Sequence, residues 1–164
     1  MKHESLGDFP LVISIPVQWG DQDAYGHVNN TVYLRWCESV RIEYLRRIGL
    51  WMIGDDGVGP ILASITCDYR KPLTYPDTVH VGVRVERIGN TSFRMDHVVV
   101  SEAQKVVAAD VRSTIVVVDY KRNKSVTVPE PVRAAIEKIE GRVFDRTHAT
   151  SSTHLWKTET PPFS

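Results

Sequence analysis

The side chains best placed for chemistry lie within one short segment, residues 21–31. It contains two carboxylates, Asp21 and Asp23, and it leads through Asn29 and Asn30 into a helical pattern. Asparagine is a good N-cap residue, so the pair predicts the start of a helix at this point. The first backbone N–H groups of a helix have no acceptor within it, and they carry the positive end of the helix dipole. A carboxylate held beside these donors suits a reaction at a carbonyl group, whose oxygen the donors would polarise.

A long helix follows this segment. Apolar residues recur at helical spacing from Val32 to Ile48, and Gly49 comes directly after two arginines and this last apolar residue. Glycine is common just beyond a helix end, and basic side chains in the last turn interact favourably with the helix dipole. The pattern therefore predicts a helix that begins at Thr31 and spans roughly 28 Å.

Alternating apolar and polar residues predict five strands, which lie at Leu11–Trp19, Ile61–Lys71, Asp77–Ile88, Thr91–Ser101 and Lys105–Tyr120. Gly89 and Asn90 predict a two-residue turn between the third and fourth strands. Residues 129–140 predict a short second helix. Strands of this length can curl around the first helix, so the sequence predicts an α+β domain with a single core.

One domain is expected over residues 1–140, with its first ten residues loosely docked and a polar tail over residues 141–164. The chain has 20 basic and 20 acidic residues, so its net charge of zero indicates neither a nucleic acid nor a membrane surface as partner. No apolar run approaches the roughly 20 residues of a membrane helix. Residues 1–4 do not resemble the start of a signal peptide.

The remaining chemical signals are mostly negative. Cys37 and Cys67 are expected to be reduced thiols in the core of a cytoplasmic protein. No Cys/His cluster has the spacing of metal ligands, so no metal site is predicted. The sequence contains neither a glycine-rich phosphate loop nor a Gly-x-Ser-x-Gly motif, which argues against a serine hydrolase.

The segment Asp21–Asn30, with the sequence DQDAYGHVNN, resembles the signature of hotdog-fold acyl-CoA thioesterases. Together with YLRW at residues 33–36, it is most similar to the 4-hydroxybenzoyl-CoA thioesterase-like group, which shares an Asp-x-Asp-x-x-Gly-x-Val pattern. The resemblance covers roughly residues 11–140. It implies a hotdog fold, in which a curled antiparallel sheet of about five strands wraps a long central helix. It also implies a homodimer or homotetramer with active sites at the subunit interface.

The resemblance assigns roles to particular residues. Asp23 is expected to be the catalytic carboxylate, whereas Asp21 is expected to order the loop. The residues expected to bind substrate are Tyr25, Gly26, His27, Asn29, Asn30 and Thr31. The carbonyl oxygen would accept hydrogen bonds from backbone N–H groups near Asn30 and Thr31. Phosphates of coenzyme A would contact basic side chains, for which the candidates are Arg70, Lys71, Arg87 and Arg94.

The implied reaction is hydrolysis of an acyl-CoA thioester, with coenzyme A as part of the substrate and no other cofactor. Asp23 would either attack the carbonyl carbon or activate a water molecule as general base, and both alternatives stay open. Two other functions compete with this one. The chain could hydrolyse thioesters of acyl carrier protein, or it could be a hotdog module that binds acyl-CoA without catalysis.

Overall fold

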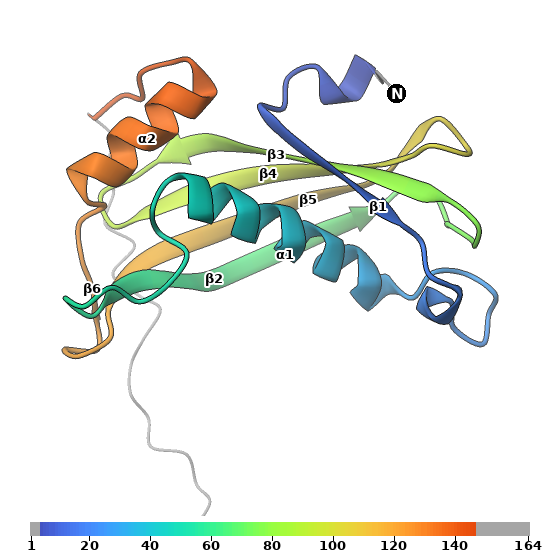
Figure 1. The fold of residues 1–164 in the computed structure, drawn as a ribbon, viewed down its shortest axis with the longest axis horizontal. Coiled ribbons are helices and arrows are strands. Elements are labelled where there is room, and N and C mark those ends of the chain that lie inside the picture. The colour runs from blue at the N-terminus through green and yellow to red at the C-terminus, as the bar shows by residue number, and fades with distance from the viewer. Residues whose placement is uncertain (1–3, 147–164) are drawn as a thin grey trace, which may run out of the picture.

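A long helix, α1 (Asn30–Arg47), lies on one face of a curled antiparallel sheet (Figure 1). The computed structural model describes residues 4–146 of the 164-residue chain. The sheet contains β1 (Leu11–Pro16), β2 (Val58–Tyr69), β3 (Thr78–Ile88), β4 (Ser92–Ser101) and β5 (Val106–Asp119). Their order is β1-β3-β4-β5-β2, and a short β6 (Lys124–Ser125) pairs with β5. The prediction of five main strands curled around a long helix is confirmed.

The helix begins and ends where its sequence directs. Asn29 is the N-cap residue, and its side chain accepts a hydrogen bond from the backbone N–H of Thr31. Beyond the last turn, Gly49 adopts a φ of 74°, which glycine reaches without steric cost. The buried side of α1 carries Val32, Tyr33, Trp36, Cys37, Val40, Arg41, Tyr44 and Leu45. All but one of these are apolar or aromatic, so the helix packs on the sheet along one stripe.

The concave face of the sheet forms the core beneath α1. Alternate residues of β3 point inward, and Val79, Val81, Val83 and Val85 are fully buried. The neighbouring strands supply Phe93, Met95, Val99, Ala109, Val111 and Ile115. Burying each large apolar side chain contributes roughly 1.5–3 kcal/mol to folding. The core therefore holds α1 in a fixed position relative to the sheet.

Several predicted boundaries are wrong. The first strand ends at Pro16 rather than Trp19: Val17 N still donates to the Asp77 carbonyl at 2.9 Å, but Trp19–Asp21 then forms a short 3-10 helix. β2 begins earlier than predicted, at Val58, and it contains a bulge between Leu62 and Ser64. The β3–β4 turn is longer than two residues, because Ile88 pairs with Phe93.

Residues 4–10 are also more ordered than predicted. Glu4–Leu6 forms a 3-10 helix, and Phe9 then lies against the convex face of β3. A Cβ atom at Gly82 would come within 2.8 Å of the Phe9 ring, so the glycine makes room for it. The Arg84 guanidinium lies 5.0 Å from the centre of the same ring. This segment therefore covers part of the outer face of the sheet.

The second helix, α2 (Glu130–Glu140), packs beside β3 and β4 at the end of the sheet farther from residues 17–29 (Figure 1). Glu140 Oε1 accepts hydrogen bonds from Tyr44 Oη and Val85 N, both at 2.6 Å. After α2, Arg142 donates to the Val85 carbonyl, and Phe144 is buried. Residues 141–146 of the predicted polar tail thus contact the domain. Residues 147–164 lie outside the described residues.

Candidate active site

Asp23 sits in a tight turn whose backbone holds its carboxylate in place. The Asp23 N–H donates to the His27 carbonyl at 2.9 Å, and the Gly26 N–H donates to the Asp23 carbonyl at 3.0 Å. Gly26 has a φ of 77°, a conformation that glycine adopts readily, so the motif glycine closes this turn. Asp23 Oδ1 accepts the backbone N–H of Tyr25 at 2.9 Å. The carboxylate is therefore oriented by one backbone donor, Tyr25 N, and is only partly exposed.

The N-terminus of α1 offers one free backbone donor. Asn29 Oδ1 accepts from Thr31 N at 2.9 Å and from Thr31 Oγ1 at 2.6 Å, while Val32 N donates to the Asn29 carbonyl. Within residues 4–146, no acceptor is present for the N–H of Asn30. Asn30 N is thus the donor available to a substrate oxygen, whereas the donor at Thr31, also proposed from the sequence, is occupied by the cap.

Asn29 also connects the helix cap with the carboxylate. Because its amide oxygen is bonded to Thr31, its amide nitrogen points away, and Nδ2 lies 3.5 Å from Asp23 Oδ2. This contact is at the long limit for a hydrogen bond. It nevertheless places the carboxylate next to the N-cap residue of α1. The Asp23 carboxylate and the start of α1, which are close in the sequence, are therefore connected through Asn29.

Two further residues frame the loop. Asp21 Oδ2 accepts the backbone N–H of Gln18 at 2.8 Å, and the Asp21 carbonyl accepts from Asn29 N at 2.8 Å. Gln22 Oε1 accepts from Tyr75 N at 3.1 Å, which ties the loop to the segment between β2 and β3. Tyr75 in turn makes an edge-on contact with the exposed ring of Trp19, with ring centres 5.6 Å apart. The carboxylate of Asp21 thus orders the loop through its backbone.

Two tyrosines pack beside the first turn of α1. Tyr69, the last residue of β2, donates from its hydroxyl to the Asn30 carbonyl at 3.0 Å. Its ring meets Tyr33 edge-on, with centres 5.2 Å apart, and Tyr33 Oη donates to the Lys71 carbonyl at 3.2 Å. Burial raises the pKa of Tyr33 to about 12, so its hydroxyl keeps its proton at physiological pH and can donate this hydrogen bond. Tyr69 was not among the site residues predicted from the sequence, because 39 residues separate it from Asn30.

Most of the residues predicted to bind substrate are exposed to solvent. Tyr25 is 88% exposed, and Gly26, His27, Asn30 and Thr31 are also exposed. The structure therefore brings Asp23, Asn29 and Asn30 together and leaves Tyr25 and His27 at the rim. These two side chains are free to contact a bound molecule or a second subunit.

The four basic residues proposed to contact coenzyme A are not gathered in one place. Arg70 and Lys71 follow β2, close to the start of α1, and Arg70 is paired with Asp110 at 2.6 Å. Arg94 is paired with Glu86, and Arg87 lies directly opposite Arg94 in the β3–β4 ladder. Nine residues separate Thr78 from Arg87 along β3, which corresponds to about 30 Å. Arg87 and Arg94 thus belong to the opposite end of the sheet from Asp23.

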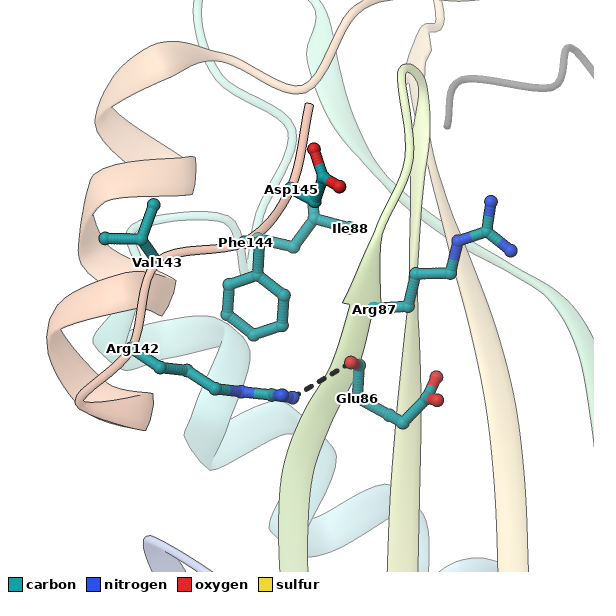
Figure 2. A pocket seen from close by; sticks show the side chains of 7 residues that line it. All are labelled: Glu86, Arg87, Ile88, Arg142, Val143, Phe144 and Asp145. Carbon is teal, nitrogen blue, oxygen red and sulfur yellow. Dashed lines mark hydrogen bonds between the residues drawn. The ribbon is translucent and has the colours of Figure 1, made fainter. Parts of the chain in front are cut away.

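A surface pocket lies at that opposite end (Figure 2). Its lining residues are Glu86, Arg87, Ile88, Arg142, Val143, Phe144 and Asp145. Arg142 Nη2 donates to the Glu86 carbonyl at 2.9 Å and stacks over Phe144, 4.4 Å from the ring centre. The pocket contains no part of the Asp23 loop. We therefore place the candidate active site at the start of α1, where the carboxylate and the free donor meet.

Among residues 4–146, no group of three or more His, Cys, Asp or Glu side chains could hold a metal ion. None of the helices in this part of the chain is long and apolar enough to cross a membrane.

The geometry places a carboxylate beside a helix start on a curled sheet, and comparison with known proteins decides the family. The family model described as the thioesterase-like superfamily matches residues 17–136, which include the whole of this site. The chain belongs to that superfamily. The predicted resemblance to hotdog-fold thioesterases, and with it the prediction of a thioester hydrolase, is confirmed.

Individual relatives agree with this assignment. The chain is 26% identical to the long-chain acyl-CoA thioesterase FadM of Escherichia coli over 119 residues, covering 71% of this chain and 89% of FadM. A thioesterase from Thermus thermophilus, solved with coenzyme A and zinc, has 32% identity and a TM-score of 0.71, covering 83% of this chain and 98% of that one. A thioesterase superfamily protein from Jannaschia shares the fold with a TM-score of 0.77 at 23% identity, covering 88% of this chain and 96% of that one. The hotdog fold is thereby confirmed.

Proposed function

We propose that this protein hydrolyses acyl-CoA thioesters to a free acid and coenzyme A, with Asp23 as its catalytic carboxylate. The observation that carries the proposal is the pairing of an oriented Asp23 carboxylate with the free N–H of Asn30. The relatives named as an acyl-CoA thioesterase and as a coenzyme A complex support the choice of substrate class.

The substrate carbonyl oxygen accepts a hydrogen bond from Asn30 N, at the positive end of the α1 dipole. Negative charge develops on this oxygen as the carbonyl carbon becomes tetrahedral, so a donor already in place lowers the barrier. Loss of one such donor typically costs about 3 kcal/mol in the transition state. The Tyr69 hydroxyl supports this arrangement because it holds the Asn30 carbonyl, and so the Asn30 backbone, in position.

Asp23 acts on the carbonyl carbon in one of two ways. As a nucleophile it forms a mixed anhydride and releases the thiolate of coenzyme A, and water then hydrolyses the anhydride. As a general base it takes a proton from a water molecule that attacks directly. Solvent oxygen found in the Asp23 carboxylate after single-turnover hydrolysis in ¹⁸O-labelled water would demonstrate the nucleophilic route, with water attacking the Asp23 carbon of the anhydride. Attack of water on the acyl carbon labels only the product acid, as the general-base route does.

The site is proposed to lie between subunits of a homodimer or homotetramer. Tyr25 and His27 are exposed in a single chain, and a second subunit or the substrate would cover them. The outer edge of β2 has no strand beside it within the described residues, and an unpaired edge of 12 residues favours pairing with another chain. Lys71, exposed beside the start of α1, is the candidate that remains for a coenzyme A phosphate.

The compartment is proposed to be the cytoplasm. Both cysteines were expected in the core: Cys37 is buried there, whereas Cys67 is only half-buried. Both are free thiols, and free thiols suit a reducing compartment.

A panel of acyl-CoA esters tests the function directly. Purified protein is assayed for release of free thiol from short, medium and long acyl-CoA, from an aromatic acyl-CoA, and from the same acyl groups on acyl carrier protein. We expect hydrolysis of at least one coenzyme A ester with kcat/KM above about 10⁴ M⁻¹s⁻¹, within the range of ordinary enzymes. Faster turnover of every carrier-protein ester would favour the carrier-protein thioesterase instead. Binding without any turnover would favour the non-catalytic module.

A further inference from the structure

Three polar side chains lie inside the core between α1 and the sheet. They are Arg41 on α1, His97 on β4 and Ser113 on β5, with exposed fractions of 5%, 2% and 0%. Arg41 Nη1, both ring nitrogens of His97 and Ser113 Oγ have no hydrogen-bond partner among the described residues. Buried polar groups are nearly always hydrogen-bonded, because removing them from water without a new partner is unfavourable. The three side chains, called here the Arg41 cluster, therefore call for a polar occupant.

The charge of the cluster indicates the kind of occupant. Burial lowers the pKa of Arg41, but arginine stays protonated in proteins. Glu38, one turn earlier, is exposed and acts on Arg41 only through space. Within residues 4–146, no ion pair joins Arg41 to a carboxylate. A buried cation without a counter-ion is strongly destabilising, so an anion would fit beside it.

His97 adds hydrogen-bonding capacity without adding charge. Burial, followed by the nearby Arg41 cation, lowers the pKa of His97 to about 3, so its ring is neutral at physiological pH. The Val111 backbone acts in the opposite direction, although neither ring nitrogen meets hydrogen-bond geometry with it. Asp96 also favours the charged ring, but its carboxylate is paired with Arg84 and Arg112. The cluster thus presents one positive charge and two neutral polar groups.

The strand register shows how far the Arg41 cluster lies from the end of the sheet that carries the Asp23 loop. Residues opposite one another on β2, β5 and β4 form successive layers: Tyr69, Ala109 and Val99; then Cys67, Val111 and His97; then Ile65, Ser113 and Met95. On α1, Tyr33, Cys37 and Arg41 follow one another at four-residue steps, so they share one side of the helix. Tyr33 contacts Tyr69 in the first layer. Arg41 therefore lies beyond the first layer, and it is near enough to His97 to act on its charge, while Ser113 occupies the next layer of the sheet.

The strip between α1 and β2 is only partly covered in a single chain. The helix packs mainly on β1, β3 and β4. The inward side chains of β2, among them Ile65 and Cys67, are half-buried and lie at the margin of the core. Arg41 is eleven residues from Asn30, or about 16 Å along the helix axis. Long side chains lean back toward the helix start, so the guanidinium lies nearer to the donor than its backbone does.

We propose that the Arg41 cluster binds a carboxylate at the far end of the acyl group, so that the substrates are mono-coenzyme A thioesters of medium-length dicarboxylic acids. This inference rests on the proposed function and names its substrate class. The thioester end lies at Asn30 N and Asp23, and the acyl chain follows the strip between α1 and β2. Hydrolysis breaks the carbon–sulfur bond, adds the oxygen of water to the carbonyl carbon and returns a proton to the thiolate. The products are a dicarboxylic acid and free coenzyme A.

The test compares two substrates of equal length. The kcat/KM of the wild type is measured for ω-carboxyacyl-CoA and for unsubstituted acyl-CoA with 6, 8, 10 and 12 carbons. We expect the carboxyl-ended ester to be favoured by about tenfold or more at one length, since a charge-assisted hydrogen bond is stronger than a neutral one. Arg41→Leu should remove this preference by slowing only the carboxyl-ended ester. Arg46→Leu, an exposed arginine on the same helix, serves as the matched control and should keep the preference.

Two results for the wild type would overturn the inference. Equal kcat/KM values for both ends at every length, or a preference for the unsubstituted chain, would mean that the Arg41 cluster is an internal hydrated site. If Arg41→Leu does not fold, Ser113→Ala takes its place and should reduce the preference several-fold. Hydrolysis that depends on Asp23 but ignores the chain end would overturn this inference alone. Absence of hydrolysis for every ester would overturn the proposed function and this inference with it.

Discussion

Asn29 does two separate things at the start of α1. Its amide oxygen caps the helix through Thr31, and its amide nitrogen faces the Asp23 carboxylate. The sequence predicted the first contact, because asparagine before a helical pattern is a recognised cap. It could not predict the second, which depends on how the turn at Gly26 brings residue 23 back toward residue 29.

Substitution of Asn29 should separate these two contacts. Asn29→Ser keeps a good cap and removes the nitrogen donor, so stability should change by less than about 0.5 kcal/mol while kcat falls several-fold. Asn29→Ala loses both contacts and should cost about 1 kcal/mol of stability as well. Thermal unfolding and steady-state kinetics measure the two effects. Equal kcat for Asn29→Ser and the wild type would show that the 3.5 Å contact has no role in catalysis.

His97 makes folding stability depend on pH. Its folded-state pKa of about 3 lies below the ordinary value of 6.5, so the folded protein resists its protonation. The stability is fully present above pH 6.5 and decreases as the pH falls from there toward 3. Between pH 7 and pH 5 this residue should remove about 2 kcal/mol from the free energy of unfolding. Denaturant titrations of His97→Leu should show a flatter pH dependence, and Met95→Leu should retain the wild-type slope.

At the scale of elements, the sequence predicted most of what positions the site. Val79, Val81, Val83 and Val85 alternate along β3, and all four are buried as the pattern requires. The helical pattern gave α1 to within a residue at each end. Trp19 continues the apolar alternation of the first strand, but the strand ends at Pro16 and Trp19 begins a 3-10 helix. Arg41 falls within the apolar stripe of α1, and periodicity alone gives no reason for its burial.

The segment after α2 is expected to stabilise the domain through Phe144. Phe144 is buried against the end of the sheet, and its N–H donates to Glu137 Oε1 at 3.1 Å. Phe144→Ala should therefore lower the free energy of unfolding by about 3 kcal/mol. The neighbouring Val143 is 84% exposed, so Val143→Ala should change it by less than about 0.5 kcal/mol. Chemical denaturation measures both, and equal stabilities would place the domain boundary before residue 144.

For the whole molecule, three open parts of the structure lie close to one another. The outer edge of β2, the half-buried strip between β2 and α1, and the exposed Tyr25 and His27 adjoin the candidate site. A single sequence cannot reveal these relationships, because they depend on strand order rather than on local pattern. The family resemblance predicts active sites between subunits, and a second subunit at this side would cover these parts.

Light scattering tests this assembly. At micromolar concentration, the mass should be twice or four times the 18.6 kDa of one chain. Pairing through β2 would cover apolar surface that a single chain leaves exposed. A monomer with full thioesterase activity would contradict a site formed between subunits.

A comparison of three variants decides whether Asp23 is the catalytic carboxylate. The rate of thiol release from the best acyl-CoA substrate is measured for wild type, Asp23→Asn and Asp21→Asn, with circular dichroism to check folding. Asparagine keeps the size and the turn-forming ability of aspartate but removes its charge. We predict that Asp23→Asn loses at least about 10³-fold in kcat while remaining folded, and that Asp21→Asn loses far less. A folded Asp23→Asn variant that turns over substrate at the wild-type rate would show that Asp23 is not the catalytic carboxylate.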